Sequence, residues 1–130
     1  DFAYVGSAFI ATAEARAPDA YKAAVLAGGA EDIVYSNLFT GVHGNYLKSS
    51  VVAAGLDPEN LPVSDPSAMN FAGGDGAKAK AWKDIWGAGQ GVGAVTEVAG
   101  AAEVVARLGR EYAAARERLA LAGRHSASGG

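Results

Sequence analysis

The chain opens with an apolar run, a glycine and an Ala-rich helical pattern, and this order limits what it can fold into. The unbroken run Phe2–Val5 predicts a strand buried on both faces, as in a parallel sheet. Gly6 and Ser7 end it, and helix follows from about Thr12. A glycine before a helix N-terminus lets backbone N–H groups approach a phosphate, and the Ser7 hydroxyl adds a donor. The alternative is an ordinary strand–helix corner that contains a glycine.

Charge and composition argue against several classes of function. The chain has 130 residues, a net charge of −3 and no cysteine. We therefore expect no basic surface for nucleic acid, no disulfide and no thiolate metal site. Two distant histidines also argue against a transition-metal centre. No apolar run approaches the length of a membrane span and no signal peptide is visible, so we expect a cytoplasmic protein without membrane contact.

The middle of the chain predicts short elements joined by loops. Helix is expected over 12–27, unless Pro18 sits at the first position of a second helical piece. Residues 33–35 predict a strand or an extended connector, and 43–54 carry a weaker helical pattern. Residues 56–76 have the composition of a long loop, before a short helix over 78–85.

The strongest helical pattern comes last. Apolar residues recur with the helical period at these positions: Val98, Ala101, Val104, Val105, Leu108, Tyr112, Ala115 and Leu119. Charges of both signs lie mostly on the opposite face, so we expect the apolar stripe to pack on a core rather than on a membrane or a partner. The polar end, Arg124–Gly130, predicts a disordered tail.

A glycine-rich stretch precedes this helix. Gly89–Ala94 fits the relaxed dinucleotide fingerprint G-x-G-x-x-A. That fingerprint needs a preceding strand within a βαβ unit of about 30 residues. Here Ala81–Trp86 precedes it and one long helix follows, so we reject the dinucleotide interpretation. The alternative is a loop that enters the final helix.

Three segments resemble one enzyme family. Val5–Thr12 (VGSAFIAT) is similar to the V-G-T-R-F-x-A-T segment at the last barrel strand of FMN-dependent nitronate monooxygenases. Residues 30–48 and 82–95 are similar to the later part of the same family, and the similarity runs from residue 2 to about 121. Ser7 and Ala8 stand where the family often has Thr and Arg. Ser7 keeps the hydroxyl, whereas the arginine charge is lost.

The resemblance implies an α/β fold, namely the C-terminal part of an FMN-binding (β/α)8 TIM barrel with a mostly helical cap. A complete barrel needs about 200 residues, so this chain alone is too short. The start at Asp1, without an initiator Met, also led us to expect an N-terminal remainder of the barrel or a companion chain. The expected regions are a last strand and helix (1–30), a cap with an A-G-Q loop (31–95), the amphipathic helix (96–122) and the tail (123–130).

The implied reaction is oxidation of alkyl nitronates by O₂ to carbonyl compounds and nitrite, with FMN as cofactor. Gly6 and Ser7 would bind the FMN phosphate. Ala88-Gly89-Gln90 is similar to the family's A-G-Q motif, so Trp86 and Gln90 would border the substrate pocket. The family's catalytic histidine belongs to an earlier strand, so we assign no catalytic residue here and do not transfer that role to His43.

Two alternatives remain open at this point. The first is an FMN-dependent NADH:quinone or enoyl-thioester reductase on the same scaffold. The second is a non-catalytic helical interaction module, which the dominant last helix and the absence of a nucleophile–base arrangement favour.

Overall fold

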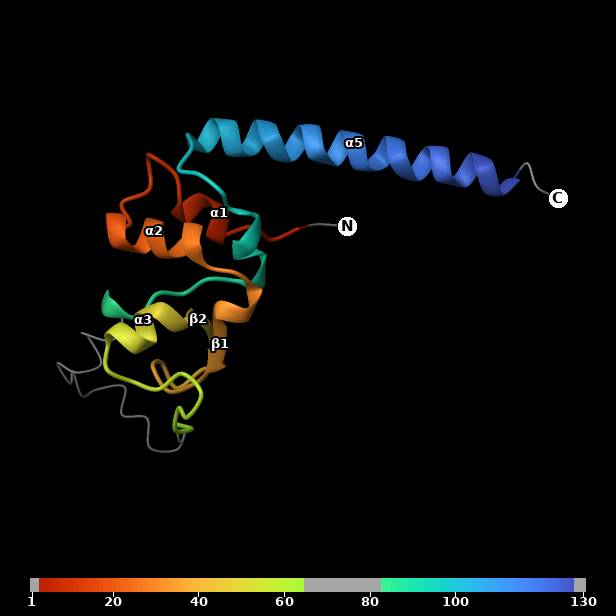
Figure 1. Cartoon of the computed structure of the whole chain (residues 1–130). Helices are drawn as coiled ribbons and strands as arrows, with labels where there is room; N and C mark the ends of the chain where they lie inside the picture. The colour runs from red at the N-terminus through yellow and green to blue at the C-terminus, as the bar shows by residue number, and fades with distance from the viewer. Residues whose placement is uncertain (1–2, 65–82, 128–130) are drawn as a thin grey trace.

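The computed structural model describes residues 3–64 and 83–127, with side chains up to residue 120. Short elements form a small body, and one long helix extends from it (Figure 1). The elements are α1 (Ser7–Ile10), α2 (Asp19–Ala27), η1 (Ala30–Asp32), β1 (Ile33–Ser36), β2 (Gly44–Leu47), α3 (Lys48–Ala53), η3 (Gln90–Ala94) and α5 (Ala101–Ala127).

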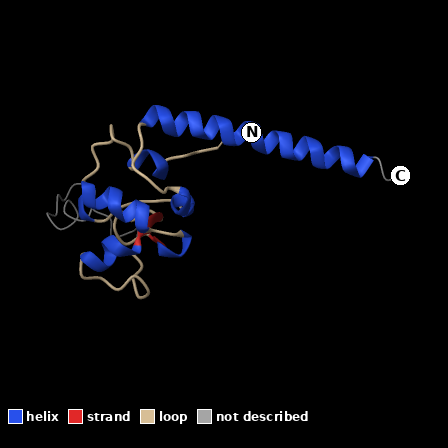
Figure 2. Cartoon of the chain, turned by 45° about the horizontal axis from the view of Figure 1, so that its top comes forward, coloured by secondary structure: helices blue, strands red, loops and turns tan. Residues whose placement is uncertain are grey.

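The sheet is a two-stranded antiparallel hairpin, surrounded by the short helices (Figure 2). β1 pairs with β2 from Ile33 opposite Leu47 to Ser36 opposite Gly44. Of the strand and the extended connector expected over 33–35, the structure shows the strand. The helix predicted over 43–54 is wrong in its first half, because β2 occupies that half and only α3 is helical. Pairing with β1 satisfies the β2 backbone, and this tertiary contact overrides the weak helical pattern.

The opening segment differs from its prediction. Residues 3–5 form no strand in this chain, and Tyr4 is fully exposed. An extended segment becomes a strand only when another strand pairs with it, and its apolar side chains stay exposed without one. Phe2 lies outside the described residues. The TIM barrel, whose other strands would come from outside this chain, stays a prediction.

Helix α2 begins one residue after the place that the proline alternative predicted, with Pro18 as its N-cap. Pro18 immediately precedes it and Asp19 is its first residue, so the continuous helix over 12–27 is wrong. Proline fixes a φ suited to the start of a helix, and its missing N–H is not needed there. Gly28 ends α2 in an extended conformation. A Cβ on Gly28 would lie 3.3 Å from Leu47, so this glycine allows α2 to approach β2 closely.

Two hydrophobic clusters hold the body together. The larger one joins α2, β2 and η3 through its buried residues: Ala11, Val25, Leu47, Ala88, Val92 and Val95. The smaller one consists of Phe39, Val51 and Ile85. The regions expected over 1–30 and 31–95 therefore share one core.

The last helix is longer and less covered than predicted. It continues to Ala127, so residues 123–127 are helical where the sequence predicted a disordered tail. A lone glycine costs only about 1 kcal/mol in a helix, so Gly123 does not end it. Core packing is confirmed only for Val104, which is buried. Most of the apolar stripe is exposed, as described below.

Candidate functional site

The segment Trp86–Gln90 runs from a pocket lined by Trp86 to the Gly6–Ser7 corner. It runs along the free edge of β2, where the Leu47 N–H donates to the Trp86 carbonyl oxygen at 2.8 Å. The Ala88 N–H donates to the Asn45 carbonyl oxygen at 3.2 Å. These two bonds fix the backbone of the segment against the hairpin, so its side chains and amides have defined positions.

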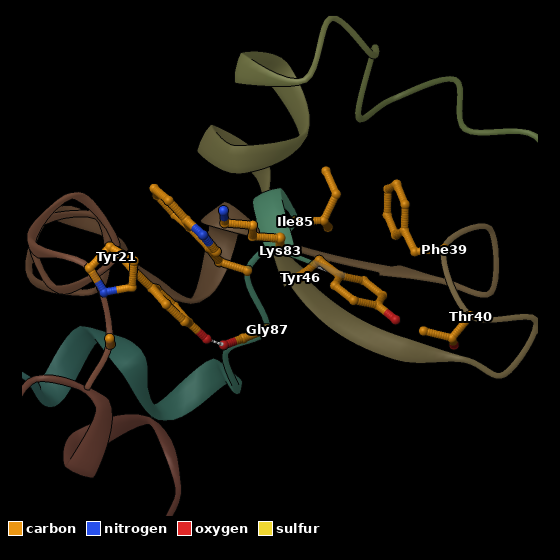
Figure 3. A pocket seen from close by; sticks show the side chains of 10 residues that line it. Tyr21, Phe39, Thr40, Tyr46, Lys83, Ile85 and Gly87 are labelled. Carbon is orange, nitrogen blue, oxygen red and sulfur yellow. Dashed lines mark hydrogen bonds between the residues drawn. The ribbon is translucent and has the colours of Figure 1, made fainter. Parts of the chain in front are cut away.

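One side of this segment borders a pocket of about 380 Å³. The pocket lies between the hairpin and α2 (Figure 3). Its aromatic lining residues are Tyr21, Phe39, Tyr46 and Trp86. Lys83 and Thr40 add a cation and a hydroxyl. A cavity of this size and lining fits a small, flat, mostly apolar ligand that carries a polar or anionic group.

A stacked aromatic pair forms one wall. The rings of Tyr21 and Trp86 lie 5.1 Å apart between centroids, at 11° to each other. The Tyr21 hydroxyl donates to the carbonyl oxygen of Gly87 (Figure 3). Burial raises the pKa of Tyr21. The phenol therefore stays protonated near neutral pH, and its proton is committed to the backbone rather than to a ligand.

The opposite wall contains Phe39 and Tyr46, which meet edge to face with centroids 4.9 Å apart at 73°. Among the described lining residues, the ionisable ones are Tyr21, Tyr46 and Lys83. No carboxylate or imidazole lines this pocket within the described part of the chain. These walls can bind and shield a ligand, whereas a general base has to come from elsewhere.

The Gly6–Ser7 corner lies at the other end of the segment. The Gly89 N–H donates to the Ser7 Oγ at 2.9 Å, although the two residues are 82 positions apart. A Cβ built on Gly6 would meet no atom within 4 Å, so the space beside this glycine is open. The corner and the A-G-Q loop, singled out separately in the sequence, are therefore in direct contact.

Of the two residues expected at the substrate pocket, Trp86 and Gln90, the structure places only Trp86 there. Trp86 lines the pocket, whereas Gln90 is exposed and is not among its lining residues. The Asn45 side-chain amide donates weakly to the Gln90 Oε1 at 3.4 Å. Gln90 therefore lies at the outer side of the hairpin.

His43 is not among the residues that line this pocket. His43 is exposed and stacks on Tyr35, with ring centroids 4.8 Å apart. His125 belongs to α5. Among the side chains of residues 3–64 and 83–120, no group of three or more His, Asp or Glu is placed to hold a metal ion. None of the helices described has the length and apolar character needed to cross a membrane.

Sequence reasoning missed most of the pocket. Tyr21, Phe39, Tyr46 and Lys83 line the pocket but were not singled out as site residues. They lie on separate elements, and no motif joins them. The one available signal was the number of aromatic residues close to the glycine-rich loops.

Comparison with known proteins adds no relative: no protein-family model, curated protein or solved structure matches the chain.

Proposed function

We propose that this chain is the C-terminal segment of a cytoplasmic FMN-dependent nitronate monooxygenase. The supporting observation is the bond between Ser7 and Gly89, because it joins the two segments that resemble the family. One of them is expected at the flavin phosphate and the other at the pocket. Their contact is what a shared flavin and substrate site requires.

The Gly6–Ser7 corner is suited to form part of a binding site for the FMN phosphate. The open space beside Gly6 allows phosphate oxygens to approach the backbone. The Ser7 hydroxyl accepts one hydrogen bond from Gly89, and a hydroxyl also has a hydrogen to donate. This corner supplies only part of a site, so further phosphate contacts belong to the N-terminal remainder of the barrel or a companion chain.

The pocket fits a nitronate. An alkyl nitronate is a small, flat anion, and Lys83 supplies a positive charge at the pocket. The Trp86 and Tyr21 stack gives it a flat wall that excludes water. When bound, FMN supplies the redox chemistry, and the protein binds and orients the reactants. The catalytic base comes from residues outside this chain.

The test uses the complete protein that carries this sequence. Intact mass and an absorption spectrum show whether a further polypeptide and a flavin accompany the chain. Under anaerobic conditions, a nitronate should bleach the flavin, whereas NADH should not. Bleaching by NADH instead supports the FMN-dependent reductase and contradicts the proposal. A complete protein that binds no FMN also contradicts it.

A second candidate is a non-catalytic helical interaction module. The specific observation that favours it is the exposed apolar face of α5, which extends beyond the body (Figure 1). A colourless, cooperatively folded protein that binds no FMN favours this module.

A further inference from the structure

Helix α5 carries an apolar seam with a seven-residue period. Its residues are separated alternately by four and three positions: Ala101, Val105, Leu108, Tyr112, Ala115 and Leu119. The side chains of Val105, Tyr112 and Leu119 are 58%, 67% and 74% exposed. Continued from Ala101 to Leu119, this spacing is typical of a left-handed coiled coil rather than of a helix on a globular core.

The body covers only the beginning of α5. Val104, beside the seam, is buried and anchors the first turn. Beyond it the helix extends past the helices and strands of the body, and the opening segment runs out on the same side (Figures 1 and 2). The seam from Val105 to Leu119 is about 21 Å long at 1.5 Å per residue. The body described here leaves this length accessible to a second helix.

We propose that the seam pairs with the α5 helix of a second copy, antiparallel to it, so that the chain forms a dimer. The favoured register places Tyr112 opposite Ala115 of the second copy. Leu108 then faces Leu119 of the second copy. Each large residue meets a small one at the centre, and the leucines pair on either side. A parallel pairing would instead stack Tyr112 on Tyr112 and Ala115 on Ala115, alternating crowded and underfilled layers.

The charges beside the seam favour the same register. The antiparallel arrangement brings Glu111 opposite Arg118 of the second copy, and two-fold symmetry repeats this pair. Glu111 is held only loosely in its own chain, 3.9 Å from Arg107. In a parallel pair Glu111 would instead face Arg116, whose guanidinium already lies over the Tyr112 ring at 5.8 Å. Flanking charges of this kind select partner and orientation in coiled coils.

The first experiment measures oligomeric state with the chain as it is. Sedimentation equilibrium from low to high micromolar concentration should show a monomer–dimer equilibrium. Leu108→Lys places a charge in the seam and should weaken the dimer by at least about tenfold. Ala113→Lys adds the same charge to the exposed helix outside the seam and should leave dimerisation unchanged. A chain that stays monomeric throughout overturns the proposal, as does an equal effect of the two lysines.

The second experiment tests orientation, and the absence of native cysteine makes it direct. Leu108→Cys and Leu119→Cys are made separately and oxidised alone or mixed. The antiparallel register predicts disulfide heterodimers in the mixture and little product from either variant alone. Homodimers from Leu119→Cys alone would show a parallel pair and overturn the proposed arrangement. Circular dichroism verifies that each variant keeps its helix.

The third experiment tests the charge pair. Glu111→Arg and Arg118→Glu should each weaken the dimer, because each places like charges face to face. Combining the two changes restores opposite charges and should recover most of the affinity. Absence of recovery contradicts the register. Glu117→Arg, on the outer face of the helix, is the control and should have little effect.

Discussion

The Ser7 Oγ accepts a hydrogen bond from the Gly89 N–H at 2.9 Å, which fastens the start of η3 to α1. The same hydroxyl is the expected phosphate donor, so Ser7 has a structural role as well as the proposed binding role. Variants of Ser7 therefore change both the loop and the site. A substitution at Gly6, whose surroundings are open, tests the binding role alone, because it leaves the bond between Ser7 and Gly89 in place.

Ser7→Ala should lower the free energy of unfolding by about 1 kcal/mol, because the half-buried Gly89 N–H loses its acceptor. Chemical denaturation of the chain measures this change. Ser7→Thr keeps the hydroxyl and is the matched control, expected to retain most of the stability. Equal stability of the wild-type and Ser7→Ala chains would show that water satisfies the amide equally well.

Gly6→Val should leave stability within about 0.5 kcal/mol of wild type, because the backbone φ of −115° suits any residue and no atom lies near the new Cβ. In the complete protein it should lower FMN affinity severely, since the side chain fills the expected phosphate space. Flavin fluorescence titration measures the affinity. Gly109→Val, also in open space but on α5, is the control. Wild-type FMN affinity in Gly6→Val would reduce Gly6–Ser7 to a structural corner.

The sequence predicted elements better than it predicted their partners. The helical period located α5, while Pro18 and the expected end at residue 27 located both ends of α2. The period could not reveal that the apolar face of α5 is exposed, because burial depends on what packs against it. Residues 3–5 failed as a strand for the same reason, since a strand needs a second strand.

The candidate site shows the same limit. Trp86 and Ser7 were found because each belongs to a local motif. The contact between Ser7 and Gly89 depends on how the chain returns along β2, which local patterns do not encode. The pocket collects Tyr21, Phe39 and Lys83 from segments that are far apart in sequence, so no spacing rule identifies them.

Tyr21→Phe should remove a phenol whose ionisation is shifted to higher pH by burial. Burial raises the pKa of Tyr21, so the folded pKa lies above the unfolded one. The resulting stability is complete below the unfolded pKa and is lost as pH rises through the folded pKa. Ultraviolet titration in the alkaline range should show a late component, a tyrosine that ionises at higher pH, which is absent from Tyr21→Phe. Tyr35→Phe, at an exposed position, should leave the late component in place.

Trp86→Leu and Gln90→Ala should have different effects in the complete protein. Trp86 lines the pocket and stacks on Tyr21, so Trp86→Leu should raise KM for the nitronate. Gln90 is exposed, so Gln90→Ala should change stability by less than about 0.5 kcal/mol. The A-G-Q resemblance predicts that Gln90→Ala still alters substrate kinetics. Steady-state kinetics decide this, and an unchanged profile would make the Gln90 segment a linker.

The junction between the body and α5 should depend on pH through Glu14. The Ala101 N–H donates to both carboxylate oxygens of Glu14, at 3.1 and 2.9 Å. This bond lowers the pKa of Glu14, because it stabilises the charged form. A negative charge also suits the N-terminus of a helix.

The stability of this junction therefore depends on pH. The folded pKa is depressed, so the stabilisation is present above the unfolded pKa and is lost as pH falls through the folded pKa. The Ala101 amide resonance should therefore titrate at a pH below the ordinary glutamate range. In Glu14→Gln this titration should disappear and the first turn of α5 should fray more at neutral pH, while Glu117→Gln, farther along α5, should leave both unchanged. An Ala101 resonance that titrates identically in wild type and Glu14→Gln would show that another acid holds the start of the helix.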